Sequence, residues 1–113
     1  MAFDEETTAR FRDALGGMEG IAEKRMMGGT CFMLDGNMLG GASRAKAGQR
    51  RFMFRIGKDN VAKGDDLPGG QRVVMGKRPM NGFFHVDADE CSDDLLKRWL
   101  SLALEFNAEL PPK

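Results

Sequence analysis

The sequence predicts an α+β domain with two layers, an antiparallel sheet of about five to six strands and an N-terminal and a C-terminal helix on one of its faces. The two long segments with helical periodicity lie at the ends of the chain, and mostly short strand-like segments separated by glycine-containing turns lie between them. Consecutive hairpins favour antiparallel pairing. With 113 residues, 42% of them hydrophobic, the chain fits a single domain over 1–113.

The first helix is expected from Asp4 to Leu15. Asp4 is a suitable N-cap, and the two glutamates after it suit the positive end of the helix dipole. Gly16 and Gly17 supply the left-handed conformation that ends a helix. One stripe follows a spacing of three and four: Phe3, Thr7, Phe11, Leu15 and Met18.

Three strands are expected next, over residues 21–27, 30–34 and 38–43. Glycines at 28 and 29 separate the first two. Asp35-Gly36-Asn37 joins the second and third, because Gly and Asn tolerate the positive φ angles of a tight hairpin.

The second half of the chain continues the sheet. Residues 44–51 form a basic loop, and residues 51–56 alternate apolar and other side chains, which predicts a half-buried strand. Residues 58–63 are expected to make one or two helical turns, followed by a loop over 65–70. Two more strands, 71–75 and 82–86, are predicted on either side of a turn at 78–82.

The last helix is expected from Ser92, as N-cap, to about Glu109, before two prolines. Its apolar residues cover about half of the circumference, which is wider than the stripe of about 100° needed to pack on one sheet. Either the helix is sandwiched inside the fold or part of it meets a second subunit. The sequence therefore indicates a possible protein interface at Leu96, Leu100 and Leu104.

Composition and charge limit the functional classes to which the protein can belong. The formal net charge is zero, whereas a dedicated nucleic-acid binder usually has a positive excess. No apolar run approaches the length of a membrane span, and the acidic N-terminus lacks the features of a signal peptide. The two cysteines are too few for a disulfide framework, which favours reduced thiols and a cytoplasmic location.

Candidate chemical groups are few, and the sequence predicts no enzyme, no cofactor and no metal site. His85, the only histidine, lies on a predicted strand, where Asp87 on the same face could pair with it. Cys91 precedes the last helix, whose N-terminus favours a thiolate, but neighbouring acids oppose this. Cys31 reads as a small core residue. The acids between Asp87 and Asp94 do not have the spacing of a calcium loop.

A run of basic residues without acids lies between Asp35 and Asp59. Such a run could contact phosphates, although stacking aromatics are absent from its loop. Charge runs of this kind are more often solvated, or dock to another protein. The possible basic contact patch consists of Arg44, Lys46, Arg50 and Arg51.

Three motifs follow one another along the chain. They are Arg25-Met26-Met27-Gly28-Gly29 with its following strand and Asp35-Gly36-Asn37-Met38, then Arg55-Ile56-Gly57, then Arg78-Pro79-Met80-Asn81-Gly82-Phe83. In this order they resemble the first hairpin, the next strand end and the Arg-Pro-Met turn of the N-terminal domain family of TfoX. The departures are Met27 in place of a usual phenylalanine, Lys77 in place of a usual glycine, and residues 44–51, which look like an insertion.

The resemblance implies a stand-alone N-terminal domain with a fold similar to secretion chaperones, which commonly dimerise. Full-length members of the family are similar to regulators of natural competence that act on transcription with a cyclic-AMP receptor protein. The sequence therefore predicts a non-enzymatic regulatory module that binds a protein partner or a second copy of itself. The alternatives are direct nucleic-acid binding through residues 44–58 and a small-ligand site near His85.

Overall fold

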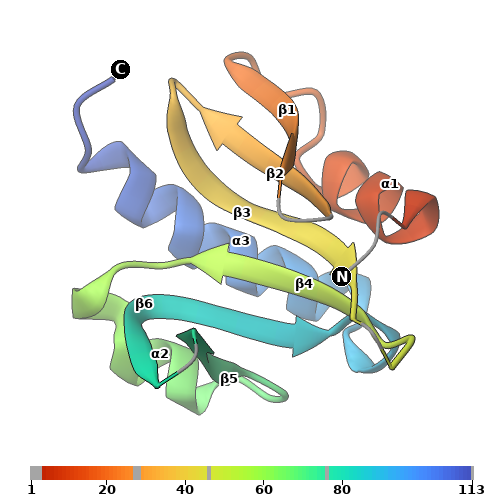
Figure 1. Cartoon of the computed structure of the whole chain (residues 1–113). Helices are drawn as coiled ribbons and strands as arrows, with labels where there is room; N and C mark the ends of the chain where they lie inside the picture. Colours follow the sequence, from red (N-terminus) through yellow and green to blue (C-terminus); the bar gives the residue numbers. More distant parts are fainter. Residues whose placement is uncertain (1–3, 27–28, 46, 76, 113) are drawn as a thin grey trace.

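A computed structural model describes residues 4–26, 29–45, 47–75 and 77–112 and has the predicted α+β architecture (Figure 1). All neighbouring strands of its single six-stranded sheet pair antiparallel, in the order β1-β2-β3-β4-β6-β5. The strands are β1 (Ile21–Met26), β2 (Gly29–Leu34), β3 (Asn37–Arg44), β4 (Arg50–Arg55), β5 (Gln71–Met75) and β6 (Arg78–Asp87). The helices are α1 (Glu5–Ala14), α2 (Val61–Asp66) and α3 (Asp93–Ala108), with 3-10 turns η1 (Lys58–Asn60) and η2 (Ala88–Glu90).

Both terminal helices cover the same face of the sheet, as the sequence predicts. Phe54 of β4 stacks on Phe11 of α1, with 5.8 Å between the ring centroids, and on Trp99 of α3, with 5.5 Å. Since one side chain contacts both helices, α1 and α3 form a single layer. Among the described residues, no helix is long and apolar enough to cross a membrane.

Side-chain caps start the two long helices where the sequence places them. Asp4 accepts a hydrogen bond from the backbone N–H of Thr7 at 2.9 Å, and Ser92 accepts one from Leu95 at 3.1 Å. These bonds satisfy amide groups that have no partner inside the helix. The φ angles of Gly16 and Gly17, 63° and 75°, end the first helix as expected.

The hairpin between β2 and β3 is confirmed, with one difference in its turn. The two turn residues are Asp35 and Gly36, with φ angles of 53° and 84°. Asn37 is already the first residue of β3, and its side-chain amide donates to the carbonyl of Pro111 at 3.0 Å. The asparagine therefore connects the hairpin to the segment after α3.

The predicted turn at residues 78–82 is wrong, because these residues form the first half of β6. Pro79 is tolerated there because this part of β6 pairs with β5 through an irregular ladder, in which Val74 lies opposite Pro79. Gly82 has a φ of 87°, and its carbonyl accepts the N–H groups of Ile56 and Gly57. The short helical segment is also longer than expected and reaches Asp66.

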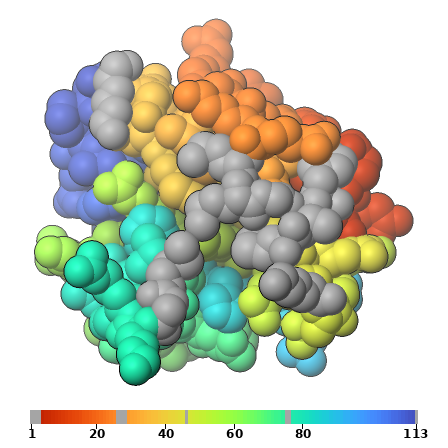
Figure 2. Space-filling view, viewed as in Figure 1, coloured from red at the N-terminus to blue at the C-terminus, as the bar shows by residue number. Residues whose placement is uncertain are grey.

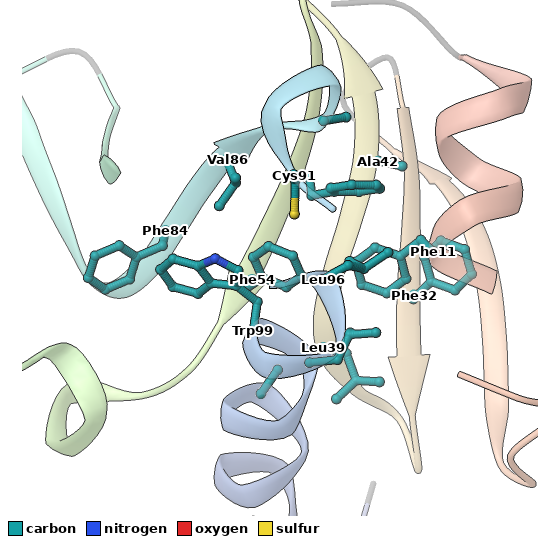
Figure 3. Packing of buried hydrophobic residues seen from close by; sticks show 14 of the residues in the cluster. Phe11, Phe32, Leu39, Ala42, Phe54, Phe84, Val86, Cys91, Leu96 and Trp99 are labelled. Atoms are coloured by element: carbon teal, nitrogen blue, oxygen red, sulfur yellow. The ribbon is translucent and has the colours of Figure 1, made fainter. Parts of the chain in front are cut away.

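The core lies between the sheet and the helices (Figure 3). Aromatic rings form a continuous chain through it, with centroid distances of 4.4 Å between Phe11 and Phe32 and 5.3 Å between Phe84 and Trp99. Gly70 allows the close approach of Trp99, because a Cβ atom at this position would lie 2.5 Å from the indole ring. Expectations for Phe3, Met27 and Gly28 fall outside the described residues.

Candidate functional site

The face of the sheet opposite α1 and α3, here called the open face, carries one row of residues across all six strands. Strand alternation places these residues away from the core, because Met53 lies between the buried Phe52 and Phe54, and His85 between Phe84 and Val86. The register joins them from edge to edge: Lys24, Cys31, Gly41, Met53, His85 and Gln71. Figure 1 looks onto this face, and Figure 2 gives the same view in space-filling form, with β1 near the top and the start of β6 at the lower left.

Partly buried apolar side chains flank this row. Met33 and Met38 lie opposite each other on β2 and β3, and Phe83 lies opposite Arg55 on β6 and β4. The guanidinium of Arg55 lies 5.9 Å from the centroid of the Phe83 ring and 5.2 Å from that of Phe106 on α3, within reach of cation–π contacts with both. The open face therefore combines thioether and aromatic surface with positive charge.

His85 does not form the acid–base pair that the sequence left open. Its side chain is partly buried, and this burial, together with the nearby charge of Arg51, lowers the pKa of the imidazole. A carboxylate partner would raise this pKa instead. One carboxylate oxygen of Asp87 accepts the N–H of Asp89 at 3.1 Å and caps η2.

Both cysteines are buried thiols. Cys31 is 4% exposed and its Sγ lies 3.6 Å from Sδ of Met33, while burial raises its pKa and the charge of Lys24 opposes this rise. Cys91 is 3% exposed, and its pKa is raised mainly by burial, with Arg10 lowering it. For Cys91, burial therefore outweighs the charge of Arg10, and the pKa lies above its ordinary value.

Asp93, in the first turn of α3, has a structural partner in Arg10. The side chain of Arg10 lies 3.1 Å from Asp93 and donates to the carbonyl oxygens of Ala88 and Cys91, which fastens α1 to the segment before α3. In the part of the chain that the structure describes, no three His, Cys, Asp or Glu side chains are grouped so as to hold a metal ion.

The predicted basic contact patch is largely engaged in ion pairs. Arg44 and Arg50 both approach the buried carboxylate of Asp4, at 2.8 and 3.3 Å, and Arg50 also pairs with Glu6 at 2.9 Å. Arg51 lies opposite Asp87 in the β-ladder. Lys46 lies outside the described residues. The positive charges of Arg44 and Arg50 are therefore directed toward the start of α1.

The three leucines of the predicted interface on α3 lie in or against the core of the chain. Leu96 and Leu100 are 1% and 2% exposed and belong to the core between α3 and the sheet, while Leu104 is partly buried and packs against that core. The wide apolar arc of the helix is thus accounted for largely within the chain. Whether a partner binds α3 stays a prediction.

Sequence reasoning did not single out two features. One is the open-face row, for which the alternation of residues 51–56 was a signal. The other is a polar hollow of about 140 Å³ between α1 and β1, where Arg12 binds Glu23 through two bonds of 2.6 and 2.8 Å. The hollow is lined by Glu5, Arg12, Glu23, Lys24, Arg25 and Thr30.

These features describe a small two-layer α+β domain whose distinguishing surface is an open sheet face. The family model of the TfoX N-terminal domain matches residues 13–107, and the chain belongs to this family. It is a family of regulatory type and not a known enzyme family. Neither a curated protein nor a solved structure gave a significant match.

Proposed function

We propose that this protein is a regulatory module that binds another protein through the open face of its sheet. The observation that carries the proposal is the group of partly buried apolar side chains on a face that α1 and α3 leave free. The members of this group are Met33, Met38, Met53 and Phe83.

The residue types suit a docking surface. An antiparallel sheet with one face on the core usually presents polar side chains on the other face. Here Met33 and Met38 face each other on β2 and β3, and Met53 lies further along the same face on β4, opposite Gly41. Thioether side chains are flexible and polarizable, and they adapt to different apolar partners, which is why they are frequent at promiscuous binding surfaces.

Charge favours an acidic partner segment. Lys24 and Arg51 are cations on the open face, and Asp87 lies opposite Arg51. The guanidinium of Arg55 adds positive charge at the edge of this face, where it lies between the rings of Phe83 and Phe106. A partner that presents apolar side chains flanked by carboxylates would bury the methionines and complement this charge. We therefore propose an acidic amphipathic segment of a protein as the occupant of this face.

The family membership supports a role in the control of gene expression, and we propose on that basis that the partner belongs to the transcription or competence machinery of the cytoplasm. Self-association remains an alternative for the same surface. Sedimentation at micromolar concentrations distinguishes the two, because a homodimer forms without any other protein.

The proposal is tested by affinity capture with the full chain and a variant, Met53→Glu, which places a carboxylate in the middle of the open face. The partner recovered with the wild-type chain should be lost with this variant and retained with Arg98→Glu, an exposed position on α3. Far-UV circular dichroism and thermal unfolding establish that each variant is folded. Equal recovery by a folded Met53→Glu variant would refute the open face as the binding surface.

A further inference from the structure

The guanidinium of Arg55, the last residue of β4, lies between two aromatic rings. Its central carbon is 5.9 Å from the centroid of the Phe83 ring on β6 and 5.2 Å from that of the Phe106 ring on α3. All three residues are partly buried. Because contact with the rings restricts the motion of the arginine side chain, less conformational entropy is lost when a ligand binds its N–H groups.

A close approach of backbone segments positions the two rings. The carbonyl of Gly82 accepts the N–H groups of Ile56 and Gly57, at 2.8 and 3.2 Å. A Cβ atom on Gly57 would clash with the Phe106 ring, and one on Gly82 would lie 2.8 Å from the backbone of Gly57. Two segments that are separate motifs in the sequence thus meet at the end of β4 and build the surroundings of the guanidinium.

The charge of Arg55 has no counter-charge in the part of the chain that the structure describes. Among these residues, its guanidinium has neither a carboxylate at ion-pair distance nor a hydrogen-bond acceptor. Arg10 and Arg12, by contrast, pair with carboxylates at 3.1 and 2.6 Å. Glu105, on the last part of α3, pairs with Lys63 at 3.6 Å. Partial burial removes hydration from the Arg55 cation, and this loss favours an anion from outside the chain.

The shape and charge of the guanidinium select the kind of anion. Its N–H donors lie in its own plane, so rings on its faces leave the edge of the group open to a ligand. This edge matches the two oxygens of a carboxylate, to which it donates two parallel hydrogen bonds. A carboxylate also balances a single arginine, whereas a phosphate monoester carries a charge of about −1.5 to −2 at pH 7 and requires further cations.

We propose that Arg55 is a binding site for a carboxylate group, and that an acidic side chain of the partner segment occupies it. The second part rests on the function proposed above, whereas the carboxylate site itself does not. Phe83 belongs to the apolar group of the open face and also contacts the guanidinium, so a segment that lies on this group reaches Arg55 at its edge.

NMR titration of the isotope-labelled full chain with sodium acetate tests the site itself, at pH 7 and at an ionic strength kept constant with sodium chloride. The Nε–H signal of Arg55, assigned from its loss in Arg55→Lys, should shift and saturate. Restricted motion is worth up to about tenfold in affinity, so half-saturation should come at about a tenfold lower acetate concentration than for Arg98, which is exposed on α3. An unsaturable response at Arg55, equal affinity at Arg98, or tighter binding of inorganic phosphate would overturn the carboxylate site.

A pair of synthetic peptides tests the occupant. One is a blocked amphipathic peptide of leucine and glutamate, and the other has glutamine in place of glutamate. By fluorescence anisotropy, the wild-type chain should bind the glutamate peptide at least about tenfold more tightly. Arg55→Gln should lose most of this preference, and Arg98→Gln should keep it. Circular dichroism and thermal unfolding establish that each variant is folded.

The outcomes separate this inference from the function on which its second part rests. An undiminished preference in folded Arg55→Gln, or no binding of the glutamate peptide by the wild-type chain, would overturn the assignment of an acidic segment to Arg55. Loss of the preference in Arg55→Gln together with unchanged binding by Met53→Glu would support the carboxylate site and refute the open face as the binding surface.

Discussion

The carboxylate of Asp4 joins the start of α1 to the middle of the sheet, and its removal gives a measurable loss of stability. Asp4 is 6% exposed and accepts the backbone N–H and the hydroxyl of Thr7, at 2.9 and 2.8 Å. Burial raises its pKa, but the bonds from Thr7 and the charges of Arg44 and Arg50 outweigh this and hold the pKa below its usual value.

The magnitude follows from the separate contributions. Asn is as good an N-cap as Asp, so Asp4→Asn keeps the cap and loses the charge. The side chains of Arg44 and Arg50 are 42% and 33% exposed, so each ion pair is screened by water and contributes about 0.5–1 kcal/mol. Asp4→Asn should therefore lower the free energy of unfolding by about 1–2 kcal/mol. Asp4→Ala, which also loses the cap, should lower it by about 2–3 kcal/mol.

Urea denaturation at pH 7 measures these differences, and a loss of this size should move the midpoint by about 1 M at unchanged slope. A lowered pKa in the folded state stabilises the protein above the unfolded-state pKa of about 3.9, and this contribution disappears as the pH falls through the folded-state pKa. The gap between wild type and Asp4→Asn should thus be full above about pH 5 and close in stronger acid. Asp13→Asn, an exposed carboxylate on the same helix, is the matched control. A gap below about 0.3 kcal/mol at pH 7, or one that persists in strong acid, would refute this account of Asp4.

Two further predictions concern the core and the open face. Gly70→Ala should lower the free energy of unfolding by about 1–3 kcal/mol by overpacking, since its Cβ atom would lie 2.5 Å from the Trp99 ring. In a Trp99→Phe background this loss should be smaller. Additive losses in a double-mutant cycle would contradict the contact. Because the His85 pKa is lowered in the folded state, the unfolded chain takes up the proton first, and wild-type stability should fall as the pH drops below about 6.5. Between pH 7.5 and pH 5, the variant His85→Gln should lose less stability than the wild type, as measured by urea denaturation. Equal losses in both proteins would contradict the role of His85.

Local signals in the sequence were sufficient to predict where the two terminal helices begin and where the hairpin between β2 and β3 turns. Asp4 and Ser92 are identifiable as caps because capping depends only on a side chain and the amides that follow it. The turn at Asp35 and Gly36 is equally local, because it depends on the φ angles that these residues accept. The error at residues 78–82 came from reading Pro79 and Gly82 as a turn, when the irregular ladder with β5 accommodates both.

The candidate site depends on contacts that no local pattern contains. Alternation along a strand predicts that Met53 and His85 point away from the core. That Cys31 and Gln71 lie in the same row depends on the register of all six strands. The pairing of Asp4 with Arg44 likewise spans 40 positions. The sequence therefore did not indicate that the arginines of the basic loop have carboxylate partners. Long-range pairing of this kind follows from the fold and not from composition.

Trp99 gives the protein a built-in optical reporter. The chain has one tryptophan and no tyrosine, so its near-ultraviolet emission arises from a single point in the core. The ring is fully buried, and within the described residues its indole N–H has no hydrogen-bond acceptor, an environment in which emission shifts to the blue. Because Trp99 contacts Phe54 and Phe84, fluorescence will follow the separation of α3 from β4 and β6, while opening at the β1 edge will leave the signal unchanged.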